Sequence, residues 1–326
     1  MTPLSKTEEM PSWLNRQRFR AVMISVIVAA CAYLIAVFWS GWDDVSSAIA
    51  IIGWYGVVIA LVLSLVNYGL RFIRWQLYLS VLGYSLSWLP SLQIYLAGFA
   101  LTTTPGKSGE LLRSILLKQR GMPLTSSVTA FLCERLSDVL AVTALTLFGF
   151  VVYPDTQLLI LSAATILILW YWIILQEKPL CFLQKTLKRF VFISHWLTRI
   201  QGLMQQIRRC HTPVLLASTT ALSLVAWGAE AFAFHIILEL LGYDIPLGIA
   251  IFIYAISMLA GAISFMPGGL GGAEAVMITL LLWQGVDTGP AVAATLIIRL
   301  ATLWFAVLLG LLAALGLKPS SNKNVL

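Results

Sequence analysis

The chain has 326 residues, of which 60% are hydrophobic and only 11% are charged. Soluble globular domains carry about 45–50% apolar and about 25% charged residues. The mean hydropathy of +0.90 therefore excludes a soluble globular protein and indicates an integral membrane protein.

Several apolar runs are long enough to cross a bilayer, which takes about 20 helical residues. They are 20–40, 51–70, 124–152, 157–175, 213–241 and 289–316. The first run is not a signal peptide, because it follows a polar leader (1–19) and lacks a cleavage site of small residues. We expect an all-α polytopic membrane protein with one transmembrane domain, 20–316, and a short cytoplasmic tail, 317–326.

Lysine and arginine predict the orientation, because they concentrate in cytoplasmic loops. Basic residues precede the first run and follow the last one, whereas the loop with Trp42-Asp43-Asp44 has none. We expect both termini in the cytoplasm and a multi-pass location in a bacterial cytoplasmic (inner) membrane.

The connecting segment 176–212 is basic, and its apolar residues recur near helical spacing. It is either an amphipathic helix lying on anionic headgroups or a plain connector whose charges set the topology.

The chain contains an internal repeat over about 51–152 and 213–316. Leu63-Ser64-Leu65-Val66 returns as Leu222-Ser223-Leu224-Val225. In the later part the offset is slightly larger, so that Glu110 returns as Glu274 and Arg135 as Arg299. An odd number of crossings separates the copies, and the basic residues of the first are lost from the second, as the positive-inside bias predicts for inverted copies. Inverted repeats are typical of transporters.

Each copy has a break between two short apolar helices. The first reads Thr102-Thr103-Thr104-Pro105-Gly106-Lys107-Ser108-Gly109-Glu110, and the second Pro267-Gly268-Gly269-Leu270-Gly271-Gly272-Ala273-Glu274. Proline stops a helix and glycine lets the backbone turn. We interpret each as a re-entrant hairpin whose second helix directs its positive N-terminal end inward. The hinge residues are Pro105, Gly106, Gly109, Pro267, Gly268, Gly269, Gly271 and Gly272.

Charged residues lie near the middle of two apolar runs. A charge at mid-membrane costs at least about 2.5–3.5 kcal/mol, so each should be compensated and face the protein interior. One interpretation is a structural network in which Glu110 and Glu274 neutralise Arg135 and Arg299. The other is a polar chamber that receives an anionic headgroup, since the planar guanidinium suits phosphate oxygens. The candidate binding residues are Arg71, Arg74, Glu110, Arg113, Glu134, Arg135, Asp138, Glu274 and Arg299.

Other motifs point to no chemistry. Pro-Gly-Lys-Ser-Gly at 105–109 lacks the first glycine and the preceding strand of a nucleotide-binding P-loop. The four cysteines and three histidines are scattered without metal-ligand spacing. We therefore expect no metal, no cofactor and no nucleic-acid partner.

One set of residues carries a family resemblance: Arg71, Arg74, Trp75, Gly109-Glu110, Arg113, Gly121, Glu134-Arg135, Asp138, Pro267 to Glu274, Gly285 and Arg299. In these residues the chain resembles the flippase-like transmembrane family that includes the membrane part of lysylphosphatidylglycerol synthase, the multiple peptide resistance factor. The resemblance covers about 50–316, implies lipid translocation and two opposed re-entrant hairpins, and leaves the lipid unnamed. The synthase members carry a soluble aminoacyl-transfer domain after the membrane part, whereas only ten residues follow 316 here, so we expect no aminoacylation of lipid by this chain.

The favoured function is flippase- or scramblase-like movement of an anionic phospholipid or a polyprenyl-phosphate carrier, with membrane lipids as partners and no enzymatic activity. One alternative is a membrane glycosyltransferase with Asp43-Asp44 as its acidic pair, although its external loop is short and the repeats have no role in that scheme. Another is a non-transporting membrane scaffold. The sequence does not indicate whether the chain binds a protein partner or forms an oligomer.

Overall fold

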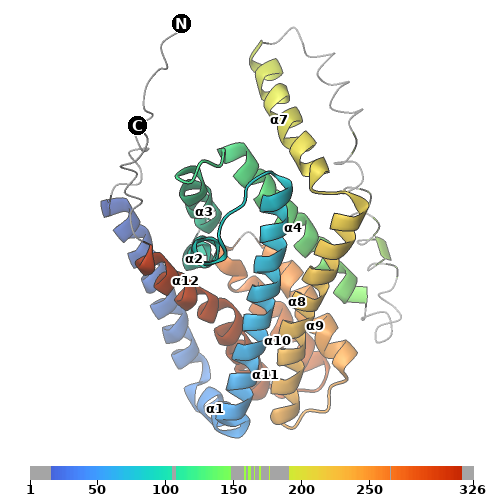
Figure 1. Ribbon diagram of the computed structural model, residues 1–326. Coiled ribbons are helices and arrows are strands. Elements are labelled where there is room, and N and C mark those ends of the chain that lie inside the picture. Colours follow the sequence, from blue (N-terminus) through green and yellow to red (C-terminus); the bar gives the residue numbers. More distant parts are fainter. Residues whose placement is uncertain are drawn as a thin grey trace, which may run out of the picture.

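The computed structural model describes residues 16–104, 108–147, 191–264 and 266–317, with a few isolated positions between 158 and 176; side chains are described from residue 46 on, except at 108–111, 191–199 and 267. These residues form helices and no strand. The all-α architecture predicted from the sequence is therefore confirmed, and Figure 1 shows the helices gathered into one bundle.

The first helix, α1 (Arg16–Val81), descends and then rises again in Figure 1. Its backbone stays helical through residues 41–50, where the sequence predicted a loop around Trp42-Asp43-Asp44. The left-handed backbone conformation lies later, at Gly53 (φ +66°), where the absence of a Cβ removes the steric penalty. The side chains of Asp43 and Asp44 lie outside the described part.

The first half continues with α2 (Trp88–Ala97), the 3-10 turn η2 (Gly98–Leu101), α3 (Ser108–Lys118) and α4 (Leu124–Thr146). Glycines with positive φ end two of the helices, at Gly83 (φ +88°) and Gly121 (φ +86°). In each case the next amide donates back to a carbonyl of the last turn, from Tyr84 to Leu79 and from Met122 to Leu117. This pairing is the usual glycine C-cap.

The second half consists of α8 (Pro213–Leu240), α9 (Leu247–Ile263), the turn η6 (Pro267–Gly269), α10 (Gly272–Trp283), α11 (Thr288–Arg299), the π-helical turn η7 (Leu300–Trp304) and α12 (Phe305–Gly316). Gly242 (φ +88°) and Gly285 (φ +81°) end α8 and α10 in the same way. The glycine caps therefore recur with the repeat.

Equivalent helices in the two copies of the sequence repeat begin at equivalent positions. The starts of α2 and α9, at Trp88 and Leu247, differ by the same offset as Leu63 and Leu222. The starts of α3 and α10, and likewise of α4 and α11, differ by the larger offset that relates Glu110 to Glu274. The later part of α1 and α8 run in opposite directions in Figure 1.

The two copies touch at equivalent positions. Asn67 Nδ2 of α1 donates to Ala226 O of α8 at 2.9 Å, and Ala226 is the residue that corresponds to Asn67 in the second copy. The pseudo-two-fold axis therefore passes beside Asn67.

Among the described residues, three helical stretches are long and apolar enough to span a membrane: Ser46–Val81, Pro213–Leu240 and Thr288–Gly316. They correspond to the predicted runs 51–70, 213–241 and 289–316. Run 124–152 contains the 23-residue α4, and run 20–40 is helical in its backbone. Most of run 157–175 lies outside the described residues.

Helix α7 (Val191–Arg209) occupies the later part of the predicted basic segment. Ile207 is 2% exposed and, with the half-buried Met204, packs in the cluster that contains Cys133 of α4. Thr129 of α4 donates to Gln206 of α7 at 3.1 Å. This end of α7 therefore uses its apolar face for packing inside the protein.

Helix α12 crosses η2 at close range, at Gly310. A Cβ at this position would overlap the backbone of Phe99 and Ala100. On the same helix, nothing lies within 4 Å of a Cβ built on Gly316. Only a glycine therefore allows α12 to lie this close to the first break.

We predict that Gly310→Ala lowers the free energy of unfolding by about 1–3 kcal/mol, since it overpacks a backbone contact. Gly316→Ala is the matched control and should stay within about 0.5 kcal/mol. Unfolding of the detergent-solubilised variants, followed by circular dichroism, measures both. Equal stability of the two variants would contradict the close crossing.

Candidate functional site

A cavity of about 530 Å³ lies where the two halves meet. Both breaks contribute to its wall, the first through Thr102 and Thr104 and the second through Gly268 and Gly269. Its polar and aromatic lining comes from several helices and includes Tyr68, Arg71, Tyr95, Arg113, Glu134, Arg135, Trp227, Glu230, Tyr254 and Arg299.

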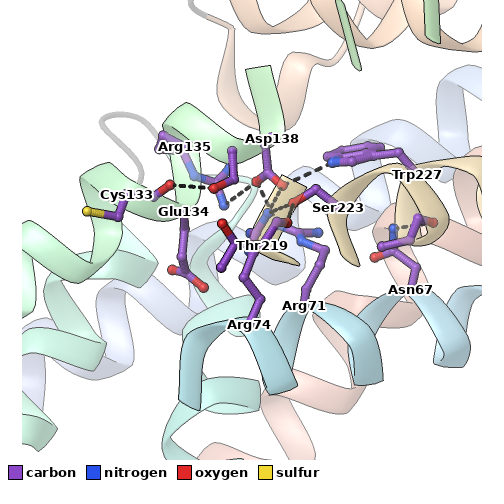
Figure 2. A network of polar contacts seen from close by, with 12 residues as sticks. Asn67, Arg71, Arg74, Cys133, Glu134, Arg135, Asp138, Thr219, Ser223 and Trp227 are labelled. Carbon is purple, nitrogen blue, oxygen red and sulfur yellow. Dashed lines mark hydrogen bonds and ion pairs between the residues drawn. The ribbon is translucent and has the colours of Figure 1, made fainter. Parts of the chain in front are cut away.

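One carboxylate, Asp138 of α4, organises the charges on one side of this cavity (Figure 2). Its Oδ1 accepts hydrogen bonds from Arg74 Nη1 at 2.6 Å and from Trp227 Nε1 at 3.0 Å. Its Oδ2 lies 3.1 Å from Arg135 Nη2 and 3.6 Å from Arg71 Nη2. Three guanidinium groups thus surround a single carboxylate.

The three arginines differ in how tightly they are held. Arg74 is 0% exposed and also donates to Ser223 Oγ at 2.5 Å, so it joins α1 to both α4 and α8. Arg71 and Arg135 line the cavity. All three arginines keep a buried Nε without a hydrogen-bond partner. The Arg135 side chain is 30% exposed.

Aromatic rings support the two cavity-facing arginines. The guanidinium of Arg71 lies 5.3 Å from the Trp227 ring centre, and that of Arg135 lies 5.5 Å from the ring centre of Phe131. Such cation–π contacts contribute about 0.5–2 kcal/mol each. They hold the guanidinium planes in place while leaving N–H groups available for an anion.

A balanced ion pair lies beside this cluster. Arg113 Nη2 donates to Glu134 Oε2 at 2.7 Å, and both side chains are almost fully buried. The guanidinium also lies 5.2 Å from the Tyr95 ring centre and 5.7 Å from that of Trp75. A Cβ at Gly98 would lie 2.7 Å from Arg113 Cγ, so this arginine packs directly on the backbone of the first break.

The second break is held by Arg299, the last residue of α11. Its Nε donates to Glu274 Oε1 at 2.7 Å, and its Nη2 donates to Gly268 O at 2.8 Å. Gly268 has a φ of +65°, which turns its carbonyl away from a helical path. The predicted neutralisation of Arg299 by Glu274 is therefore present, and this arginine fixes the break to the end of α11.

The predicted binding residues divide into two groups. Arg71, Arg113, Glu134, Arg135 and Arg299 line the cavity, while Arg74, Asp138 and Glu274 are not part of its lining. Gly109 lies in the first turn of α3, and Gly271 (φ +83°) and Gly272 lead into α10. Pro105, Gly106 and the side chain of Glu110 lie outside the described part, so the pair of Glu110 with Arg135 stays a prediction.

Several lining residues were not predicted as site residues from the sequence, and Glu230 of α8 is the most consequential. It is 4% exposed, and its Oε2 accepts a hydrogen bond from Tyr254 at 2.6 Å. Within the described side chains it forms no ion pair closer than 4.0 Å. The repeat register pointed to it, as the counterpart of Arg71 in the second copy. No feature of the sequence pointed to the aromatic lining residues in a comparable way.

Among the described residues, no group of three or more His, Cys, Asp or Glu side chains is placed to hold a metal ion. Cys133 and Cys210 are buried free thiols. Their burial agrees with a packing role.

An all-helical membrane protein with a central charged cavity is the class that this fold and site define. The chain belongs to the family described as the lysylphosphatidylglycerol synthase TM region, whose model matches residues 22–310.

Its relatives include UPF0104 membrane proteins of archaea. One from Methanothermobacter thermautotrophicus is 24% identical over 319 residues, covering 90% of this chain and 94% of that protein. One from Pyrococcus horikoshii is 22% identical, covering 92% of this chain and 97% of that protein. One from Archaeoglobus fulgidus is 25% identical, covering 79% and 84% respectively. These similarities extend over nearly the whole membrane domain.

We predict that Asp138→Asn lowers the free energy of unfolding by about 3–5 kcal/mol, because it leaves buried guanidinium groups uncompensated. Adding Arg71→Gln should recover part of that loss, since it removes one of the stranded charges. Denaturant unfolding of the single and double variants measures the coupling. Strictly additive losses would contradict the shared-carboxylate arrangement.

Proposed function

We propose that this protein moves a phosphate-bearing lipid across the membrane, with the headgroup passing through the central cavity while the acyl chains stay in the bilayer. The headgroup is that of an anionic phospholipid or a polyprenyl phosphate. The protein acts like a flippase or scramblase, and it makes and breaks no covalent bond in the lipid.

The observation that supports this function best is the excess of positive charge around Asp138. Three guanidinium groups surround this one carboxylate, and two of them, Arg71 and Arg135, also line the cavity. Removing an ion from water costs several kcal/mol unless a partner compensates it. A phosphate oxygen between Arg71 and Arg135 supplies that compensation. It accepts hydrogen bonds from the guanidinium N–H groups that the aromatic rings hold in place.

In this proposal the second break does not bind the headgroup through the N-terminal end of its helix. Glu274 lies in the first turn of α10 and already matches the positive end of that helix. The headgroup phosphate therefore binds at the arginines of α1 and α4, and the break of the second half forms the opposite wall. In this scheme both breaks are re-entrant hairpins, which satisfy their irregular backbone by facing a wet cavity.

The proposed membrane location, topology and energy source are taken from the sequence. The protein lies in a cytoplasmic membrane with both termini in the cytoplasm, as the distribution of lysine and arginine indicates. Because the sequence carries no P-loop, the energy for movement comes from an ion gradient, a lipid gradient or a partner.

We predict that purified protein in liposomes exchanges a labelled anionic phospholipid between leaflets, and that Arg135→Ala slows the exchange by about tenfold or more. The expected loss is that of one charge-assisted hydrogen bond, about 1.5–3 kcal/mol. Extraction of a short-chain labelled lipid by albumin measures the rate.

Arg120→Ala is the matched control, because Arg120 is exposed and does not line the cavity. Arg299→Ala should slow exchange as well, but with a measurable loss of stability, since Arg299 fixes the second break. Unchanged exchange by Arg135→Ala would remove the arginine from the proposed path.

We also predict that lipid co-purified with the wild-type protein is enriched in anionic phosphate headgroups, compared with the bulk membrane. Mass spectrometry of the extracted lipid measures the ratio. A pool that matches the bulk membrane in composition would argue against a specific headgroup site.

A further inference from the structure

Glu230 is a carboxyl on the cavity wall that the proposed headgroup site does not use. It lies on α8, one helical turn after Ala226, whose carbonyl contacts Asn67 beside the pseudo-two-fold axis. Arg71 lies one turn after Asn67 on α1, so the two copies place opposite charges at equivalent positions. Both side chains line the same cavity.

The charged and titratable groups around Glu230 come from the described helices that pack closely against α8, which are α1, α4, α9 and α11, and from α8 itself. Of these, Tyr254 donates a hydrogen bond to Oε2, and Arg71 and Arg299 lie within electrostatic range. By helix, the groups are Tyr68, Arg71 and Arg74 of α1, Glu134, Arg135 and Asp138 of α4, Tyr254 of α9, Arg299 of α11, and His235 and Glu239 of α8 itself.

The cations near Glu230 already have other partners. Arg299 donates to Glu274 and to Gly268 O. Arg71 is the loosest, since it lies 3.6 Å from Asp138 Oδ2. It is therefore the guanidinium for which an ionised Glu230 and a bound phosphate compete.

We infer that Glu230 is a proton-binding site and that a proton and an anionic headgroup occupy the cavity together. This inference rests on the proposed function. An ionised Glu230 repels an anion in the same cavity, whose protein walls lower the effective dielectric below that of bulk water, and attracts Arg71 away from the anion. A proton taken from water onto Glu230 removes both effects. By linkage, each ligand then strengthens the binding of the other.

The coupling determines what crosses the membrane. One singly charged headgroup and one proton move as a neutral pair, so a proton gradient drives net lipid movement and a lipid gradient drives protons. The proton enters from one aqueous side, resides on the Glu230 carboxyl and leaves to the other side with the headgroup. The carboxyl is regenerated in each cycle without other chemistry.

The experiment adds phosphatidylglycerol to the outer leaflet of proteoliposomes that contain a trapped pH indicator. Potassium with an ionophore removes any membrane voltage, and protein-free vesicles give the background. Lumen acidification and lipid entry are followed together. The wild-type protein should acidify the lumen by about one proton per lipid that enters, and its entry rate should rise by up to about tenfold per unit fall in pH.

Glu230→Gln keeps the shape of the side chain and cannot ionise. It should still move lipid, without lumen acidification and with a rate that no longer depends on pH. Glu239→Gln is the matched control on the same helix. The Glu239 side chain is 55% exposed and pairs with His235, so this variant should behave like the wild-type protein.

The results of these measurements distinguish failure of the proton site from failure of the proposed function. Lipid entry into wild-type vesicles without acidification, or equal acidification by Glu230→Gln, overturns the proton site and leaves the proposed function standing. Absence of lipid entry above protein-free vesicles at every pH overturns the proposed function itself. If Glu230→Gln does not fold, the proton-to-lipid ratio of the wild-type protein still decides whether a proton moves with each lipid. A ratio near zero overturns the proton site.

Discussion

The structure depends on the cost of placing ionised side chains away from water. Arg74, Arg113, Glu134, Asp138 and Arg299 are all buried, and each has an oppositely charged partner within 2.7 Å. A buried ion that loses its partner destabilises a protein by about 3–5 kcal/mol. These pairs therefore constrain how α1, α3, α4, α10 and α11 can be arranged, and they build the walls of the cavity as a consequence.

The two copies of the repeat form a symmetric scaffold, but charged residues at equivalent positions have different partners. Arg135 and Arg299 occupy equivalent positions, yet Arg299 is fully engaged by Glu274 and Gly268, whereas Arg135 shares Asp138 with two other arginines. At the position of Asp138 the second copy has Thr302. One half therefore fixes its break rigidly, and the other keeps guanidinium groups available at the cavity.

Much of this arrangement follows from the sequence. The inverted copies were predicted, because lysine and arginine mark the cytoplasmic side. The helix starts and glycine caps recur with the repeat, because a repeat preserves local turn chemistry. The charged cluster was predictable as a set, since any mid-membrane charge must be compensated. Of its ion pairs, that of Glu274 with Arg299 was predicted, whereas the pairs of Asp138 and of Arg113 were not. The pairing of Arg74 with Asp138 joins two helices that are distant in the chain, and the contact of Arg71 with the Trp227 ring depends on how α1 and α8 cross. The turn of α1 was predicted too early, because an acidic stretch resembles a loop while only Gly53 has the left-handed conformation.

A site that moves a headgroup must bind it without retaining it. A phosphate held by several fully available arginines, each contributing about 1.5–3 kcal/mol, would leave the cavity slowly. In the proposed function, sharing the Asp138 carboxylate would weaken that hold, because Oδ2, which lies 3.6 Å from Arg71 and 3.1 Å from Arg135, would replace a departing phosphate at both arginines. The carboxylate thus stabilises the empty state as well as the fold. A longer contact at Arg71 than at Arg135 further implies that Arg71 changes partner first. In the proposed function, the same cluster that stabilises the protein would therefore set how easily the headgroup is released.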